Sequence, residues 1–202
     1  ERDTSHHLKK VFNRTHENKK GSYESFIRCE ILGPCSPAKL KALKQEVERS
    51  LDDVEASVED WMSMRKHLEE AIANLKKNPP PISKEALKES IRFLDWIEDN
   101  HFTFLGYCEY SLNGEKKKDS RIFAPEKGLG ILRSSQKQEL SHIFEGVQLD
   151  STAWDFITDP DPLILTKTTQ ISLVHRRDPM DSITIKRFDK DGKVVGLYQF
   201  IG

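Results

Sequence analysis

Apolar residues recur every three or four positions across residues 36–76, the spacing of one face of an α-helix. The positions on this face are Leu40, Leu43, Val47, Leu51, Val54, Val58, Trp61, Met64, Leu68, Ile72 and Leu75. Ser36 and Pro37 predict the start, because serine is a good N-cap and proline suits the first helical position. An unbroken helix here would be about 60 Å long. We therefore expect a break, with Asp60 as the N-cap of a second helix.

A shorter helix is predicted after the segment Lys76-Lys77-Asn78-Pro79-Pro80-Pro81, because proline cannot continue a helix. Ser83 is the expected N-cap, and the helix should run to Asn100. Its apolar face consists of Leu87, Ile91, Leu94 and Ile97, widened by Phe93 and Trp96. We expect this face to lie across a sheet, with Trp96, Phe102 and Phe104 buried at the contact.

The remaining apolar segments alternate or are short, as strands do. Asn113-Gly114 favours a type I′ hairpin between two of them. A helix is expected only over 135–146 within this part of the chain. The predicted strands are 23–32, 101–110, 121–124, 128–132, 163–168, 171–175, 183–188 and 194–201. The fold class is therefore α+β, a helical arm plus an antiparallel-sheet module.

Composition argues against two classes of partner. The chain of 202 residues is 32% charged and has a formal net charge of −1, whereas nucleic-acid-binding domains usually carry a basic excess. Its apolar runs are far shorter than the roughly 20 residues that cross a bilayer. We therefore expect neither nucleic acid nor a membrane as a partner, and a cytoplasmic location.

Few residues of the chain are candidates for a catalytic or metal site. Cys29 and Cys35 are too far apart for a zinc knuckle, and Cys108 lies in an apolar strand pattern, so all three thiols are expected to be structural. The histidines His6, His7 and His16 are expected to be solvated rather than metal ligands. No cofactor or metal site is expected.

One polar group, between two predicted strands, stands out from this background. It consists of His175, Arg176, Asp178 and Asp181. Two interpretations stay open: a solvated or capping loop, or a contact with a ligand or another subunit, because charged loops beside apolar strands often carry recognition.

Several separated blocks resemble one protein family, the large bacterial NAD-specific glutamate dehydrogenases. Trp96 precedes the block Phe102-Thr103-Phe104-Leu105-Gly106-Tyr107. The other blocks are Val58-Glu59-Asp60-Trp61 with Met64-Arg65, Gly128-Leu129-Gly130-Ile131-Leu132-Arg133, Val174-His175-Arg176-Arg177-Asp178-Pro179-Met180-Asp181 and Lys186-Arg187-Phe188-Asp189. The resemblance covers most of residues 23–202. Cys108 and Arg177 depart from the family pattern.

The resemblance implies a cytoplasmic homo-oligomeric enzyme that deaminates glutamate to 2-oxoglutarate with NAD. In that family ACT-like and PAS-like modules occupy the N-terminal half, and the catalytic lysine and the dinucleotide-binding fold lie elsewhere. We expect this chain to be a piece of that half, with neither end a natural terminus. The expected division is 1–35 as the last strand of a truncated ACT-like domain, 36–80 as a helical arm or linker, and 81–202 as a PAS-like or ACT-like module.

Three functions are consistent with these expectations. The first is a non-catalytic regulatory and oligomerisation segment that contacts other subunits and senses an amino acid or another metabolite. The second is a structural spacer for subunit assembly without a ligand. The third, which has the least support, is an independent enzyme using Cys108 or His175. We also expect the helical arm to be separable from the 83–202 module and to promote self-association.

Overall fold

The computed structural model describes residues 27–113, 121–123, 128–133 and 151–202. It divides the chain into two compact units, Glu1–Ala42 and Leu43–Gly202. In the first unit, residues 27–36 contain no strand, so the strand expected over 23–32 is wrong for its part within the described residues. Helix α1 begins at Pro37 as predicted, and the Lys39 N–H donates to Ser36 Oγ at 3.3 Å.

Helix α1 is continuous from Pro37 to Lys77, so the break expected at Asp60 is wrong. Asp60 does not cap a helix, because its carboxylate accepts hydrogen bonds from the Gly130 N–H at 2.7 Å and from Arg133. Because α1 continues through this position, no helix terminus is present for Asp60 to cap.

Helix α2 (Lys84–Trp96) begins as predicted, with the Ala86 N–H donating to Ser83 Oγ at 3.1 Å. A π-helical turn, η1 (Ile97–His101), follows it and ends the helix at Asn100, which adopts a left-handed φ of 60°. Asparagine tolerates this conformation better than most residues. The turn redirects the chain toward the sheet.

The sheet of the second unit is antiparallel at every pairing between described strands. Its strands are β1 (Gly106–Asn113), β2 (Arg121–Phe123), β3 (Leu129–Gly130), β4 (Leu163–Ile171), β5 (Pro179–Phe188) and β6 (Val194–Ile201). The order is β2-β1-β6-β5-β4, with β3 paired to β1. Strands β4, β5 and β6 follow one another in sequence with no helix between them. A β-α-β-β-α-β order of the ACT type has no three successive strands of this kind, so the PAS-like alternative fits this order better.

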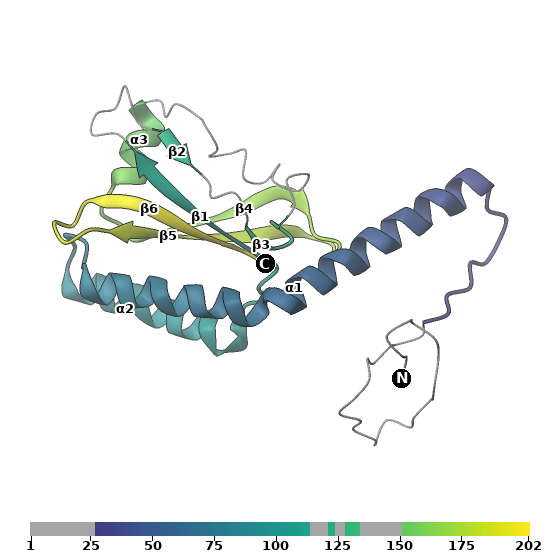
Figure 1. The fold of residues 1–202 in the computed structure, drawn as a ribbon, viewed down its shortest axis with the longest axis horizontal. Coiled ribbons are helices and arrows are strands. Elements are labelled where there is room, and N and C mark those ends of the chain that lie inside the picture. The colour runs from purple at the N-terminus through teal and green to yellow at the C-terminus, as the bar shows by residue number, and fades with distance from the viewer. Residues whose placement is uncertain (1–26, 114–120, 124–127, 134–150) are drawn as a thin grey trace, which may run out of the picture. The chain divides into compact units, whose positions relative to one another are not determined.

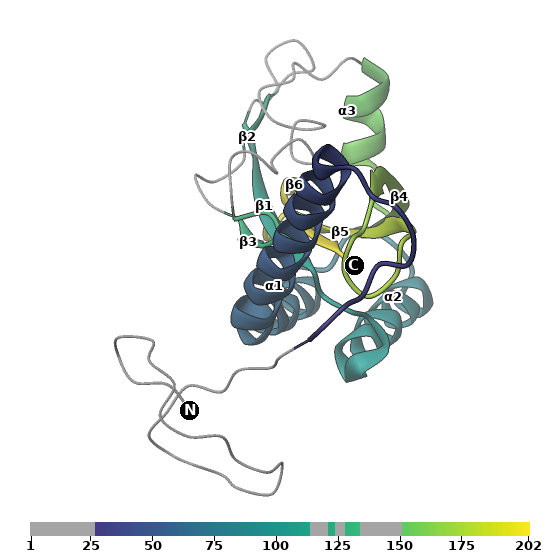
Figure 2. The ribbon, with the colours of Figure 1, turned by 90° about the vertical axis from the view of Figure 1, so that its right-hand side faces the viewer.

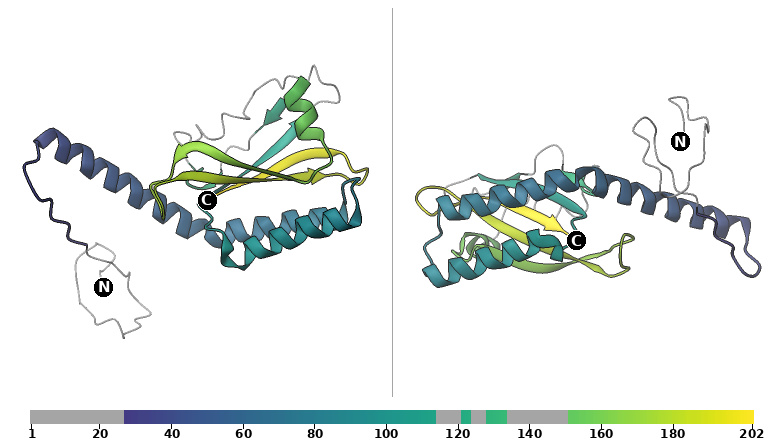
Figure 3. Two further views of the ribbon diagram at one scale, coloured as in Figure 1. Left: turned by 180° about the vertical axis from the view of Figure 1, so that it is seen from behind. Right: turned by 90° about the horizontal axis from the view of Figure 1, so that it is seen from below.

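Helices lie on both faces of this sheet. The C-terminal half of α1 and helix α2 run side by side along one face (Figures 1 and 3). Helix α3 (Ser151–Thr158), which the sequence analysis missed, lies on the other (Figure 2). Buried Lys186 of β5 holds it by donating to the carbonyl oxygens of Phe156 at 3.0 Å and Asp159 at 2.9 Å.

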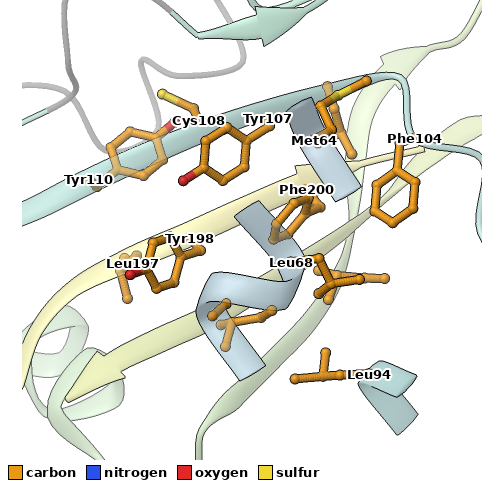
Figure 4. Packing of buried hydrophobic residues seen from close by; sticks show 14 of the residues in the cluster. Met64, Leu68, Leu94, Phe104, Tyr107, Cys108, Tyr110, Leu197, Tyr198 and Phe200 are labelled. Carbon is orange, nitrogen blue, oxygen red and sulfur yellow. The ribbon is translucent and has the colours of Figure 1, made fainter. Parts of the chain in front are cut away.

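Much of the core lies between α1, α2 and the sheet (Figure 4), and the same cluster extends to Trp154 and Ile157 of α3. Phe200 of β6 is at its centre, with ring centroids 5.7 Å from Phe104 and 4.9 Å from Tyr107. Phe104 is buried as expected and Phe102 is partly buried. The expected burial of Trp96 is wrong, because it stacks on His101 at the surface and remains 51% exposed.

The second half of α1 belongs to the same core. Its buried apolar residues are Met64, Leu68, Ala71, Ile72 and Leu75, none more than 6% exposed. The prediction of a helical arm that can be separated from the sheet module is therefore wrong for the second half of α1. The triple proline ends α1 but does not end the domain, because packing continues across it.

Candidate functional site

A cleft of about 540 Å³ opens in the second unit, beside the connection from β4 to β5. All four residues of the polar group line it: His175, Arg176, Asp178 and Asp181. The structure therefore brings together the residues that the sequence analysis singled out. Whether they contact a ligand or another subunit stays a prediction.

Local hydrogen bonds shape the β4–β5 connection. The Ser172 N–H donates to the Asp178 carbonyl at 2.9 Å and closes the loop. Within it, Ser172 Oγ donates to the Val174 carbonyl at 2.7 Å and accepts from the Val174 N–H at 3.0 Å. His175 has a left-handed φ of 64°, which is uncommon outside glycine and is found at functional or strained sites.

The charged side chains of the cleft differ in whether they have an ion-pair partner. Lys167 Nζ lies 2.7 Å from Asp181 Oδ1, but both side chains are more than half exposed, so this ion pair is weak. Within the part of the chain that the structure describes, the side chains of Arg176 and Asp178 make no hydrogen bond or ion pair. Among the described residues, the cleft thus presents the Arg176 cation and the Asp178 anion without a partner.

The remainder of the lining combines apolar and polar residues. Leu105 and Met180 are 3% and 4% exposed and form its inner wall, and Phe102 and Val174 contribute partly buried surface. Small-molecule sites are concave and combine apolar surface with a small number of polar and charged groups, and this cleft contains both.

Sequence reasoning missed Lys167, His101 and Phe102 as lining residues. For Lys167 a signal existed, because it lies opposite Asp181 in the β4–β5 register. That register was hidden because β5 begins at Pro179, four residues before the predicted start at Ile183. Asp181 was therefore interpreted as a loop residue.

The other residues that the sequence analysis named have structural explanations or lie outside the described residues. Gly130 has a φ of 61°, and a Cβ there would lie 2.1 Å from the Leu105 carbonyl oxygen, so backbone packing requires this glycine. Cys108 is buried in β1. Among the described residues, no group of three or more His, Cys, Asp or Glu side chains could hold a metal ion. His6, His7, His16 and the helix expected over 135–146 lie outside the described residues.

Within the same described ranges, no helix is both long and apolar enough to cross a membrane.

Comparisons with known proteins identify the relatives. The chain is 27% identical over 202 residues to the NAD-specific glutamate dehydrogenase of Halomonas elongata. It is 29% identical over 198 residues to the NAD-specific glutamate dehydrogenase of Pseudomonas aeruginosa. The resemblance to the NAD-specific glutamate dehydrogenases is confirmed. The match takes in nearly all of this chain but only 12% of the length of each glutamate dehydrogenase.

Two further comparisons add little to this result. No family model matches the chain. One solved structure, the periplasmic sensory domain of the Campylobacter jejuni chemoreceptor Tlp1, aligns with 78% of this chain and 56% of its own. Its TM-score is 0.29 and its sequence identity 14%, so the likeness supports no argument about function.

Proposed function

We propose that this chain is a non-catalytic regulatory and assembly segment of an NAD-specific glutamate dehydrogenase. The parent enzyme would convert glutamate to 2-oxoglutarate with NAD in the cytoplasm, and NAD would bind outside these residues. The partners of the segment are other subunits of that enzyme and an effector, either an amino acid or another metabolite. The cleft lined by Arg176 and Asp178 is the observation that carries the regulatory part of the proposal.

The size and charge of the cleft suit a small effector. Its volume of about 540 Å³ falls within the roughly 300–1,000 Å³ typical of ligand pockets. Arg176 can pair with a carboxylate of the ligand and Asp178 with a cationic group. A ligand that carries both charges would satisfy both side chains, while its apolar part rests against Leu105 and Met180.

The same cleft gives little support to catalysis. Nucleophilic catalysis needs a nucleophile within hydrogen-bond reach of a base. Among the described residues, the ring of His175 has no hydrogen-bond partner of any kind, and Cys108 lies in another part of the sheet. Binding without chemistry is the function that this arrangement favours.

A thermal-shift screen of amino acids and other metabolites tests the proposal on the 202-residue chain. An effector at one hundred times its dissociation constant stabilises the folded state by about 2.7 kcal/mol. The stabilisation should be lost in Arg176→Ala and Asp178→Ala. It should persist in Arg177→Ala, a matched control whose side chain is 79% exposed and lies outside the cleft.

A second candidate function is a spacer that assembles subunits and binds no ligand. The exposed apolar residues of α1 favour it, because such surfaces usually contact a partner. The screen separates the two functions. If no compound raises the melting temperature of the wild type, or if the cleft variants respond as the wild type does, the regulatory proposal fails and the spacer remains.

A further inference from the structure

Helix α1 carries a row of apolar side chains that face solvent between Leu43 and Trp61. We call this row the α1 stripe. Its members are between 38% and 57% exposed, except Val58 at 70%. The stripe consists of Leu43, Val47, Leu51, Val54, Val58 and Trp61. Isolated exposed apolar residues are ordinary, but a contiguous row on one helix indicates an interaction site.

Polar residues face inward on the neighbouring side of the same helical segment. Ser50 Oγ donates to the Leu173 carbonyl at 3.0 Å, and Ser57 Oγ donates to the Leu105 carbonyl at 3.0 Å. Asp60 accepts from the Gly130 N–H at 2.7 Å. These contacts fix the rotation of α1 about its axis, so the apolar stripe is held outward by specific bonds.

A pocket of about 390 Å³ adjoins the stripe. Val54, Val58 and Trp61 form one side of it, and Phe102 and Phe104 contribute to the other. Buried apolar anchors seated in such pockets supply most of the binding energy at protein interfaces. The stripe therefore combines a flat helical surface with a place for one anchoring side chain.

The spacing of the stripe indicates a helical partner. From Val47 to Trp61 the apolar positions are separated by four, three, four and three residues, the alternation that packs two helices side by side. An amphipathic helix with apolar residues at the same spacing would bury the stripe and present one side chain to the pocket.

The charge of residues 43–61 indicates which kind of helix would bind the α1 stripe. Residues 43–61 expose two basic side chains, Lys44 and Arg49, and five acidic ones, so the net charge of the exposed side chains is 2 − 5 = −3. The exposed acidic residues are Glu46, Glu48, Asp52, Glu55 and Glu59, whereas Asp53 and Asp60 are buried. Two copies of α1 would bring like charges together in either orientation, whereas a basic helix would be attracted. The whole chain, at −1, shows no such excess.

We propose that the α1 stripe binds a basic amphipathic helix from a part of the same enzyme outside these 202 residues. The inference rests on the proposed function, because it takes the parent to be the longer glutamate dehydrogenase. The chain matches only 12% of its relatives' length, so most of such an enzyme lies outside it. The stripe is then an acidic and apolar docking surface within the enzyme or between its subunits.

The test titrates the full 202-residue chain with two labelled synthetic helices, as long as residues 43–61, by fluorescence anisotropy. Both peptides carry leucine at heptad a and d positions, one with lysine and arginine on its flanks and the other with glutamate and aspartate. The basic peptide should bind at least about tenfold more tightly, and its affinity should fall as salt is added. Val58→Asp should weaken binding by about tenfold or more. Ala73→Asp, an exposed α1 position outside the stripe, should not.

Three results would overturn the inference: no binding of either peptide, equal binding of both, or binding that Val58→Asp leaves unchanged. If sedimentation shows a dimer of the chain that Val58→Asp dissociates and neither peptide binds, a second copy is the occupant instead. The effector screen relies on variants of other residues, Arg176 and Asp178. A failed peptide titration with intact effector binding therefore refutes this inference alone, and loss of effector binding leaves it standing.

Discussion

Replacing Leu68 with alanine tests whether the second half of α1 belongs to the core of the sheet module. Leu68 is 1% exposed and packs in the cluster that contains Leu94 and Phe104. Truncating a buried leucine removes apolar contacts and leaves a cavity, at a cost of about 2–5 kcal/mol. Val58→Ala is the matched control on the same helix, because Val58 is 70% exposed and its truncation should change stability by no more than about 0.5 kcal/mol.

The assay is urea unfolding followed by circular dichroism and by tryptophan fluorescence. Leu68→Ala should lower the transition midpoint in both signals together, since the helix and the sheet unfold as one unit. In thermal unfolding, a domain of this size loses roughly 2–4 °C per kcal/mol, so its melting temperature should fall by about 4–20 °C. If Leu68→Ala and Val58→Ala were equally mild, or the helix melted in a separate transition, α1 would be a separable arm and the core would be misassigned.

The other predictions concern two buried charged groups and the absence of turnover. The hydrogen bond from Arg133 lowers the pKa of Asp60, although burial opposes this shift. Asp60 should therefore stabilise the fold above pH 3.8, and this contribution should be lost as the pH falls through the lowered pKa. Asp60→Asn should cost about 1.5–3 kcal/mol at neutral pH and flatten the acid side of a stability–pH curve, and an unchanged curve would contradict the role of Arg133. Burial lowers the pKa of Lys186, so the stability difference between wild type and Lys186→Met should move in favour of the wild type as pH rises from that lowered pKa toward 10.5. A difference that stays constant in urea titrations over this range would show that Lys186 is not desolvated. The 202-residue chain should not oxidise NADH with 2-oxoglutarate and ammonium, and turnover that survives repurification and scales with its concentration would refute the non-catalytic proposal.

Local signals were enough to place several elements. Ser36 and Ser83 mark the starts of α1 and α2 correctly, because an N-cap depends on the side chain and a few following N–H groups. Strand β6 was predicted with its observed bounds, since its apolar run follows the turn that contains Gly192. The pairing of β1 with β2 was also expected, although Asn113 pairs with Arg121 and not across a two-residue turn.

The cleft shows the limit of such reasoning. His175, Arg176, Asp178 and Asp181 could be singled out because they lie close together in sequence. Their neighbour Phe102 comes from a segment more than seventy positions earlier and meets them only when β1 and β5 both pair with β6. Strand order is a property of the whole sheet, and no local pattern encodes it.

The periodicity of α1 determined that the chain forms a long amphipathic helix, but it did not determine which face is buried. Steps of three and four residues allow the apolar row to shift to a neighbouring face without leaving the pattern. The buried face runs through Asp53, Ser57 and Asp60 and continues to Met64 and Leu68. In the first half, backbone groups of other segments require polar partners, so serine and aspartate point inward and the apolar stripe points outward. Only the tertiary structure could decide this, because the carbonyl of Leu105 and the N–H of Gly130 reach α1 from far along the chain.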